Sequence, residues 1–260
     1  MSHPDHEKNR VAWNEMVEVH WKHADYKVRE FLEGWCSLHN IELREFGDVS
    51  GKRLLHLMCQ FGMDALSWAR RGVIVTGVDI SDASIKRAHK LKQMADLKAE
   101  FYRCDILDLV GVIDGKFDIV YQSYGTHCWI CDLDRWAQVI AHYLKPGGFF
   151  FIIDSHPISA IYEDTNCSYL SGGPFRYSDQ PDYCDRDHII ESELVEFQHP
   201  LSAFVNALIG AGLVIERMDE YDKGYYPVQE DWYEQDGYWY PPGGPPRYPL
   251  MFSLKARKPK

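Results

Sequence analysis

The apolar and polar positions of this chain change their period along its length. Between residues 9 and 40, apolar residues recur at helical spacing, and this predicts one or two amphipathic helices. The positions concerned are Trp13, Val17, Trp21 and Ala24, followed by Val28, Phe31, Leu32 and Trp35. From residue 53 to residue 154, short apolar runs alternate instead with amphipathic stretches. This second pattern is typical of strands connected by helices.

The short apolar runs predict the strands of one sheet. They lie at residues 53–57, 73–79, 99–105, 117–123 and 149–154, and two later runs lie at 213–218 and 250–257. Ser81 or Asp82 can cap the helix after the second strand, and Asp132 or Asp134 the helix before the fifth. Strands that alternate with helices imply a mostly parallel sheet with helices on both faces.

The alternation stops after residue 155. Residues 155–187 read as irregular, 189–197 as an extra strand, and 200–210 as a helix with proline in its first turn. Residues 221–249 form a long excursion rich in aromatic residues, glycine and proline. We therefore expect N-terminal helices over 1–48 and a main domain over 49–260. Cap insertions at about 155–195 and 221–249 would cover its site.

Composition limits the class of protein. The 260 residues hold 28 Lys and Arg against 39 Asp and Glu, a formal charge of −11, which makes nucleic acid an improbable partner. No apolar run approaches the roughly 18–20 residues that span a membrane. The N-terminal residues lack the apolar core of a secretory signal. The seven scattered cysteines favour reduced thiols. We expect a cytoplasmic monomer or homodimer.

Two carboxylates stand where predicted strands end. Ligands of open α/β sheets bind beyond the carboxyl ends of the strands. Asp79 ends the second strand, where its carboxylate can accept hydrogen bonds from both hydroxyls of a ribose. Asp105 ends the third strand, where it can accept from an adenine amino group. The structural alternatives are a helix cap for Asp79 and a turn residue for Asp105.

Taken in order, several segments resemble the class I S-adenosylmethionine-dependent methyltransferases over residues 50–155 and again over 199–257. They are Leu55-His56-Leu57-Met58-Cys59-Gln60-Phe61-Gly62, Val75-Thr76-Gly77-Val78-Asp79-Ile80-Ser81, Asp105, Phe117-Asp118-Ile119-Val120 and Leu144-Lys145-Pro146-Gly147-Gly148. The resemblance implies a Rossmann-like α/β fold: a seven-stranded, mostly parallel sheet whose last strand is antiparallel. S-adenosylmethionine would be the cofactor and S-adenosylhomocysteine the product.

The first loop departs from the usual pattern of that family. An acid, a hydrophobe and Gly-x-Gly-x-Gly are typical, but this chain has His56 at the acid and Met58 and Gln60 at the first two glycines. Only Gly62 remains. The loop is similar to that of a bacterial small-molecule subgroup with the sequence His-Leu-x-Cys-x-Phe-Gly. The substitutions leave less room for a ligand to approach the backbone.

The resemblance also implies which residues surround the cofactor. The methionine part would lie over the first loop, the ribose on Asp79, the adenine between Ile80 and Ile106, and the sulfonium beside Gln122 and Ser123. The N-terminal aromatic residues can close over the cofactor or simply pack against the sheet. The full cofactor set is Trp13, Trp21, Tyr26, His56, Met58, Cys59, Gly62, Asp79, Ile80, Ser81, Cys104, Asp105, Ile106, Gln122 and Ser123.

Methyl transfer requires an aligned acceptor and, for a hydroxyl or ammonium acceptor, a base. His127 and His156 follow the fourth and fifth strands and are the candidate bases, although either can instead bond the backbone. The expected acceptor-binding residues are Tyr124, His127, Trp129, His156, Tyr226 and Trp232. Aromatic faces suit a flat or cationic small molecule, or an oligomer interface. We predict no metal, because Cys128 and Cys131 form a single Cys-x-x-Cys pair.

Three other functions remain open at this stage. A protein or RNA methyltransferase is one, although the acidic charge disfavours RNA. A nicotinamide-dependent oxidoreductase is another, but no Gly-x-Gly-x-x-Gly follows the first strand. A cofactor-binding module without catalysis is the third.

Overall fold

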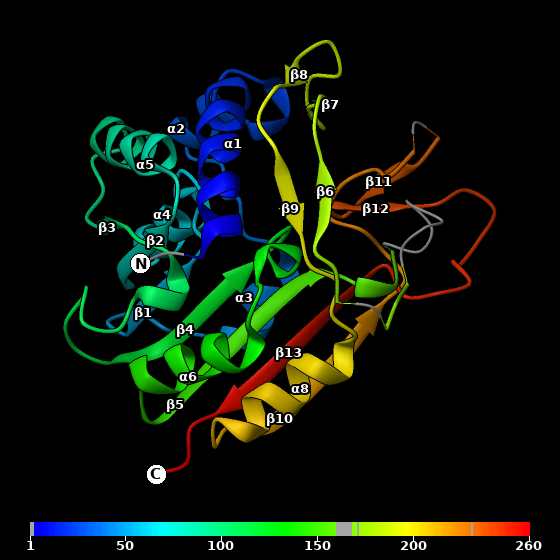
Figure 1. Cartoon of the computed structure of the whole chain (residues 1–260). Helices are drawn as coiled ribbons and strands as arrows, with labels where there is room; N and C mark the ends of the chain where they lie inside the picture. The colour runs from blue at the N-terminus through cyan, green and yellow to red at the C-terminus, as the bar shows by residue number, and fades with distance from the viewer. Residues whose placement is uncertain (1–2, 160–167, 171, 230) are drawn as a thin grey trace.

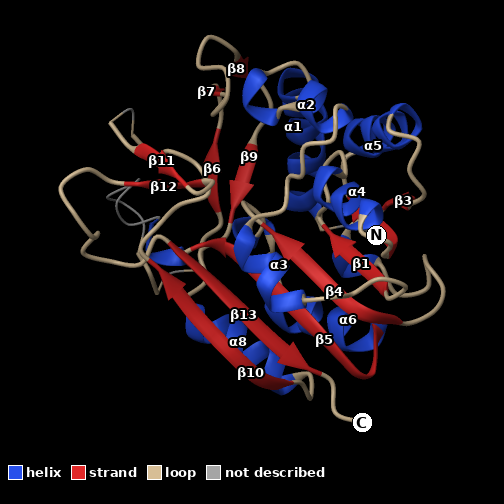
Figure 2. Cartoon of the chain, turned by 180° about the vertical axis from the view of Figure 1, so that it is seen from behind, coloured by secondary structure: helices blue, strands red, loops and turns tan. Residues whose placement is uncertain are grey.

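Seven strands form one twisted sheet at the centre of the molecule (Figures 1 and 2). A computed structural model describes residues 3–159, 168–170, 172–229 and 231–260. The strand order is β10-β13-β5-β4-β1-β2-β3. The bounds are β1 Arg53–Leu57, β2 Ile74–Asp79, β3 Glu100–Arg103, β4 Phe117–Ser123, β5 Leu144–Ser155, β10 Val214–Tyr221 and β13 Met251–Arg257.

The directions of the strands confirm the predicted architecture. Strands β3, β2, β1, β4 and β5 are parallel to their neighbours. Strand β13 is antiparallel to both β5 and β10, between which it lies. Apolar side chains dominate β1 and the middle of β5, as expected of parallel strands covered on both faces.

A different set of helices covers each face of the sheet. One face packs against α6 (Leu133–Tyr143) and α8 (Leu201–Gly210), with Trp136 and Phe204 in its core. The other packs against α3 (Asn40–Phe46), α4 (Met63–Arg70) and α5 (Asp82–Met94), with Trp68 at its centre. The predicted caps Ser81 and Asp132 accept hydrogen bonds from the backbone N–H groups of Ser84 and Arg135.

The N-terminal helical stretch begins earlier than expected and is divided into shorter elements. Helix α1 spans Pro4–His20, starting before the predicted residue 9, and it packs mainly against α5, β9 and β8. The short elements η1 (Ala24–Tyr26) and α2 (Val28–Leu32) follow it. Among the described helices, none is long and apolar enough to cross a membrane.

The predicted insertions are extended hairpins above the carboxyl ends of the strands (Figure 1). The bounds are β6 Phe175–Tyr177, β7 Gln180–Pro181, β8 Ile189–Ile190, β9 Leu194–Glu196, β11 Tyr233–Gln235 and β12 Tyr238–Tyr240. The prediction of one strand over 189–197 is wrong, because the chain bends between β8 and β9. At the bend, the Glu15 carboxylate of α1 accepts from the backbone N–H groups of Glu191 and Ser192. Residues 160–167, 171 and 230 of the expected caps lie outside the described residues.

Three single-turn helices complete the framework: η2 (Ile106–Asp108), η3 (His127–Trp129) and η4 (Pro157–Ser159). Each follows a sheet strand, so the chain turns over the carboxyl edge of the sheet at these points. Pro200 is the N-cap of α8, one position before the first turn in which the sequence placed it.

Candidate functional site

Asp79 is the last residue of β2 and is only 9% exposed. Its Oδ2 accepts a hydrogen bond from the Gln60 backbone N–H at 2.8 Å, and its Oδ1 accepts from the Ser81 N–H at 2.9 Å. Burial raises the pKa of Asp79 to about 6, so the group is ionised at neutral pH. A carboxylate has about four acceptor positions, so each oxygen keeps one for a ligand hydroxyl.

The first loop keeps a glycine-like backbone without the glycines. Met58 and Gln60 have φ angles of 54° and 49°, and Gly62 has 77°. The left-handed conformation costs a non-glycine residue about 1–2 kcal/mol. The Gln60 side chain in turn donates from Nε2 to Tyr26 Oη at 3.0 Å and lies 3.2 Å from His20 Nδ1. The loop geometry and Asp79 together fit an adenosyl ligand bound through its ribose.

His6 of α1 holds Asp105 at the other end of the expected cofactor site. Asp105 Oδ1 accepts from the Leu107 backbone N–H at 3.0 Å, and Oδ2 lies 2.7 Å from His6 Nδ1. Burial opposes a charge on His6, but the hydrogen bond and the charge of Asp105 raise the pKa of His6 to about 10. Helix α1 thus closes this end with a buried ion pair that the sequence did not reveal.

The remaining residues expected around the adenosine lie at the same edge. Ile106 is buried and Ile80 half-buried. The Cys59 backbone N–H donates to Val78 O at 3.0 Å, and Cys104 Sγ to Asp105 O at 3.1 Å. Ser81 Oγ donates to Asn14 Oδ1 of α1 at 2.8 Å. The N-terminal helix therefore contacts this edge at both His6 and Asn14.

A buried polar chain runs through His56. His56 Nε2 lies 3.1 Å from Ser123 Oγ, and Ser123 Oγ donates to Asp64 Oδ2 at 2.9 Å. Burial lowers the pKa of His56 to about 3, so its ring is neutral. Its Nδ1 is buried and has no hydrogen-bond partner. An orphaned buried acceptor beside the first loop fits a polar ligand group there.

Gln122 is enclosed by protein groups. Its Nε2 donates to Thr126 Oγ1 at 2.9 Å, and its Oε1 accepts from Trp136 Nε1 at 2.9 Å. Its Nε2 also lies 3.8 Å from Met58 Sδ. Gln122 thus connects the end of β4 to α6 and to the first loop.

Asp154, near the end of β5, organises the turn after β4. Its oxygens accept from the backbone N–H groups of Gly125, Thr126 and His127 at 2.6–3.0 Å, and from Thr126 Oγ1 at 2.8 Å. Burial disfavours its charge, but His127 and these donors lower the pKa of Asp154 below its ordinary value. Sequence reasoning missed this role, although an acid near a strand end was a visible signal.

Both candidate bases pack against the same apolar side chain, Phe252 of β13. The ring centroid of Phe252 is 6.4 Å from that of His127 and 6.2 Å from that of His156. His127 Nδ1 is 3.4 Å from Asp154 Oδ2, and His156 Nε2 is 3.0 Å from Glu220 Oε1. Burial lowers the pKa of His156 despite the nearby Glu220 carboxylate, and His156 Nδ1 accepts from the Ile158 backbone N–H at 3.1 Å, the backbone alternative that the sequence left open.

Some of the aromatic residues expected to bind the acceptor form one cluster. Tyr124 is 4.6 Å from Tyr225 between ring centroids, and Tyr225 is 4.7 Å from Tyr226. Tyr124 Oη donates to Glu42 Oε2 at 2.9 Å. Glu42 was not predicted, yet it is fully buried, and burial raises its pKa to about 8.

The tryptophans are dispersed. Trp129 Nε1 donates to Gly125 O at 2.7 Å, and the Trp129 ring meets Trp13 edge to face at 5.7 Å. Trp21 packs against Phe61 at 5.6 Å, with Arg87 over its ring. Trp232 lies beside Gly224 of the last insertion. The structure therefore brings Trp13 to Trp129 but places Trp21 elsewhere.

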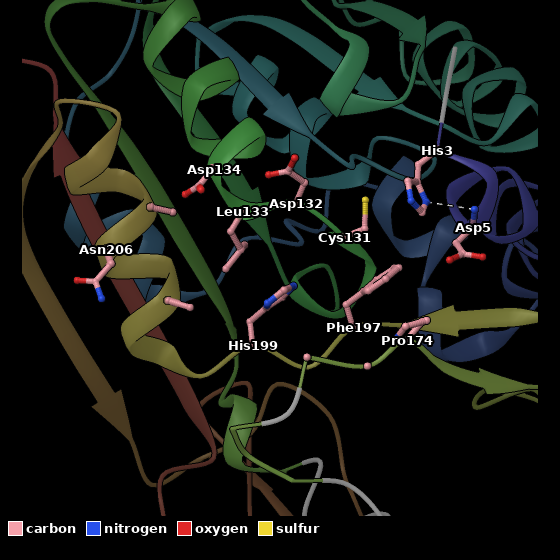
Figure 3. Close-up of a pocket in the computed structure, with 14 residues that line it drawn as sticks. His3, Asp5, Cys131, Asp132, Leu133, Asp134, Pro174, Phe197, His199 and Asn206 are labelled. Atoms are coloured by element: carbon pink, nitrogen blue, oxygen red, sulfur yellow. Dashed lines mark hydrogen bonds between the residues drawn. The ribbon is translucent and has the colours of Figure 1, made fainter.

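A pocket of about 930 Å³ opens beside this site (Figure 3). Cys131, Phe197 and His199 line it, and the Cys131 backbone nitrogen lies 3.4 Å from His6 Nε2. The other lining residues are His3, Asp5, Asp132, Leu133, Asp134, Gly172, Gly173, Pro174, Ala203, Asn206 and Ala207. None of the pocket residues was a predicted site residue. His6 lies between this pocket and Asp105.

Residues 55–152 match the family model described as "Methyltransferase domain". The phthiotriol/phenolphthiotriol dimycocerosates methyltransferase 1 of Mycobacterium ulcerans (strain Agy99) is 30% identical over 135 residues, 51% of this chain and 48% of that protein. A ubiquinone biosynthesis O-methyltransferase of Bordetella pertussis is 28% identical over 127 residues, 48% of this chain and 52% of that protein. The chain therefore spans about half the length of these curated relatives.

The fold has a close counterpart among solved structures. A SAM-dependent methyltransferase structure from Methanosarcina mazei superposes with a TM-score of 0.61 at 17% identity. The superposition covers 85% of this chain and 98% of that one. At this identity, the likeness supports the arrangement of the sheet and its helices.

Proposed function

We propose that this chain is a class I methyltransferase that transfers a methyl group from S-adenosylmethionine to a small-molecule acceptor, because residues 55–152 match the methyltransferase-domain family and the fold matches that of a solved SAM-dependent methyltransferase. S-adenosylhomocysteine is the second product. The observation that carries the proposal is the buried Asp79 carboxylate beside a loop that keeps left-handed backbone at Met58 and Gln60. Two matched relatives are themselves named methyltransferases, one of them an O-methyltransferase.

The chain holds the cofactor through groups at the strand ends. Asp79 accepts from the two ribose hydroxyls, and the adenine lies between Ile80 and Ile106. His56 Nδ1, which has no partner within the protein, accepts from a polar group of the methionine part. Asp105 accepts a hydrogen bond from the adenine amino group. The His6 side chain, which contacts Asp105 Oδ2, must move aside for this bond to form. Helix α1 acts as the cover of this end of the site.

When bound, S-adenosylmethionine supplies a methyl group on a positively charged sulfur, from which a nucleophile can displace it directly. The protein must align the acceptor and exclude water. Tyr124, Tyr225 and Tyr226 form the aromatic lid over the acceptor, with Trp129 and Trp232 at its margins. Aromatic faces and buried carboxyl groups suit a flat or cationic small molecule.

A histidine removes the proton of a hydroxyl or ammonium acceptor. His156 is neutral because burial lowers its pKa, and Glu220 can orient its ring, but the Ile158 backbone N–H must release His156 Nδ1 before that nitrogen can accept the proton. His127 is the second candidate, oriented by Asp154. Once an acceptor is found, His156→Asn is expected to lower kcat by about 100-fold or more, in the range of general base catalysis. It should also remove the acidic limb of the pH–rate profile. A larger loss in His127→Asn would transfer the role to His127.

Calorimetric titration with S-adenosylmethionine and with S-adenosylhomocysteine tests the proposal. Wild type should bind both, and Asp79→Ala should weaken binding by at least about 100-fold, because two charge-assisted hydrogen bonds are lost. Asp118→Ala is the matched control, since Asp118 also accepts a backbone N–H, from Arg53, but at the opposite end of the strands. Binding of neither ligand by folded wild type, or binding of NAD instead, would refute the proposal.

A further inference from the structure

Metal-ligating side chains from two distant segments converge beside the first loop. His20 ends α1, and His23 and Asp25 follow it at the start of η1. Asp182 and Cys184 lie in the turn between β7 and β8. The ligand atoms of His20, Asp182 and Cys184 all lie within 4.8 Å of one another, and so do those of His23, Asp25 and Cys184. Cys184 is common to both groups.

The inner group is enclosed by protein. His20 and Asp182 have side chains that are 0% exposed, and His20 Nε2 lies 2.8 Å from Asp182 Oδ2. The backbone N–H of Cys184 donates to Asp182 Oδ1 at 2.8 Å, which fixes the carboxylate. The His20 ring lies between those of Tyr26 and Tyr183, at 4.9 and 4.7 Å. The donors are therefore held in place by their surroundings.

The outer group is more exposed than the inner one, and the His23 Nδ1 in it accepts from the Asp25 backbone N–H at 3.4 Å. His23 Nδ1 and Asp25 Oδ2 are 3.5 Å apart. Metal–ligand bonds of about 2.0–2.3 Å in a tetrahedron place donor atoms roughly 3.3–3.6 Å apart. The inner His20–Asp182 pair needs to open by only about half an ångström to reach this separation.

We propose that His20, Asp182 and Cys184 bind one zinc-type divalent cation, and that His23, which has a ring nitrogen within 4.8 Å of Cys184 Sγ, turns toward the ion as the fourth ligand. Imidazole nitrogen, thiolate sulfur and carboxylate oxygen are the donors that zinc takes in four-coordinate sites. A set that includes sulfur disfavours magnesium and calcium, which prefer oxygen ligands. The spacing His20-x-x-His23 in one segment and Asp182-x-Cys184 in the other supplies two ligands from each.

The site has an orienting group of its own. With Nε2 of His20 on the metal, its Nδ1 carries the proton and must donate it. The Gln60 side-chain amide lies 3.2 Å from that Nδ1, and its oxygen reaches the position of its nitrogen when the amide turns over. The cation would thus tie the end of α1 and the β7–β8 hairpin to the first loop. This role is structural and does not depend on methyl transfer.

Metal binding can be measured on the full chain, purified without a metal-affinity tag and treated with a chelator. Cobalt(II) titration should give the absorption of a four-coordinate site with thiolate-to-metal charge transfer, at one equivalent per chain. Zinc should displace the cobalt and protect Cys184 from alkylation mapped by mass spectrometry. Cys184→Ser and His23→Ala should each weaken binding, by at least about 100-fold for the cysteine. Cys36→Ser, a half-buried thiol elsewhere, should not.

Substitution of the buried residues can prevent folding, so His23→Ala provides a second test of metal binding. His23 is partly exposed, and its substitution leaves the His20–Asp182 pair intact. Failure of folded wild type to bind cobalt or zinc would overturn the site, as would unchanged affinity in Cys184→Ser. The His20–Asp182 contact would then be a hydrogen bond that only joins two segments. Calorimetry with S-adenosylmethionine is a separate measurement, so the two proposals can fail independently.

Discussion

The ends of β2 and β5 each place a buried aspartate at the same edge of the sheet. The two carboxylates differ in how many acceptor positions remain for a ligand. Asp79 receives a backbone N–H at each oxygen and keeps room for further donors. Asp154 receives donors from four residues of its own chain, Gly125, Thr126, His127 and Ser155. The pKa values of the two groups are shifted in opposite directions. That of Asp79 is raised to about 6, and that of Asp154 is lowered below its ordinary value. Hydrogen-bond saturation, more than burial, distinguishes Asp79, which we propose binds the cofactor ribose, from the structural Asp154.

The largest expected effect is on the stability of the β5 end. Asp154→Ala leaves the N–H groups of Gly125, Thr126 and His127 without their acceptor, and each buried donor left unpaired costs about 1–3 kcal/mol. We expect a loss of roughly 3–6 kcal/mol in urea unfolding, at least about 2 kcal/mol more than for Asp79→Ala. Equal losses of stability in the two variants would contradict the structural role assigned to Asp154.

A third buried carboxyl group, that of Glu42, extends the comparison to the pH dependence of stability. Burial raises the pKa of Glu42 to about 8 from an ordinary value of 4.5, so the folded state holds the proton more tightly. Its contribution to stability is complete below pH 4.5 and is lost as pH rises through 8. Wild type should therefore lose a few kcal/mol relative to Glu42→Gln between pH 5 and 8. Parallel unfolding curves across that range would show that Tyr121 and Tyr124 hold the carboxylate ionised.

The smallest effect concerns the strained loop that presents its N–H to Asp79. Gln60→Gly and Gln60→Ala lose the same bonds to His20 and Tyr26, but only glycine adopts a φ of 49° without strain. The glycine variant should be about 1 kcal/mol more stable in urea unfolding than the alanine variant. The reverse order would show that the loop relaxes away from this conformation.

The sequence predicted what depends on neighbours along the chain. The strand and helix alternation, the caps at Ser81 and Asp132, and the position of Asp79 at the end of β2 are all confirmed. These features follow from apolar periodicity and local hydrogen bonding. The antiparallel last strand came instead from the family resemblance.

What the sequence missed depends on packing between distant segments. His6 meets Asp105 across 99 positions, and His20 meets Asp182 across 162. Nothing in the local pattern around His6 or Glu42 distinguishes them from ordinary surface-helix residues. The bend between β8 and β9 is likewise set by Glu15 of α1. Such contacts exist only once the helices have found their places on the sheet.

The position of β13 has a consequence for how the chain is made. Strand β10 joins the sheet only through β13, which follows it in the sequence and inserts between it and β5. While a ribosome is still synthesising residues 222–250, the apolar strand β5 has an open edge and β10 has no partner. Unpaired apolar edges recruit other chains. The apolar edge of β5 therefore stays open in the nascent chain until Met251–Arg257 has been made and pairs with it.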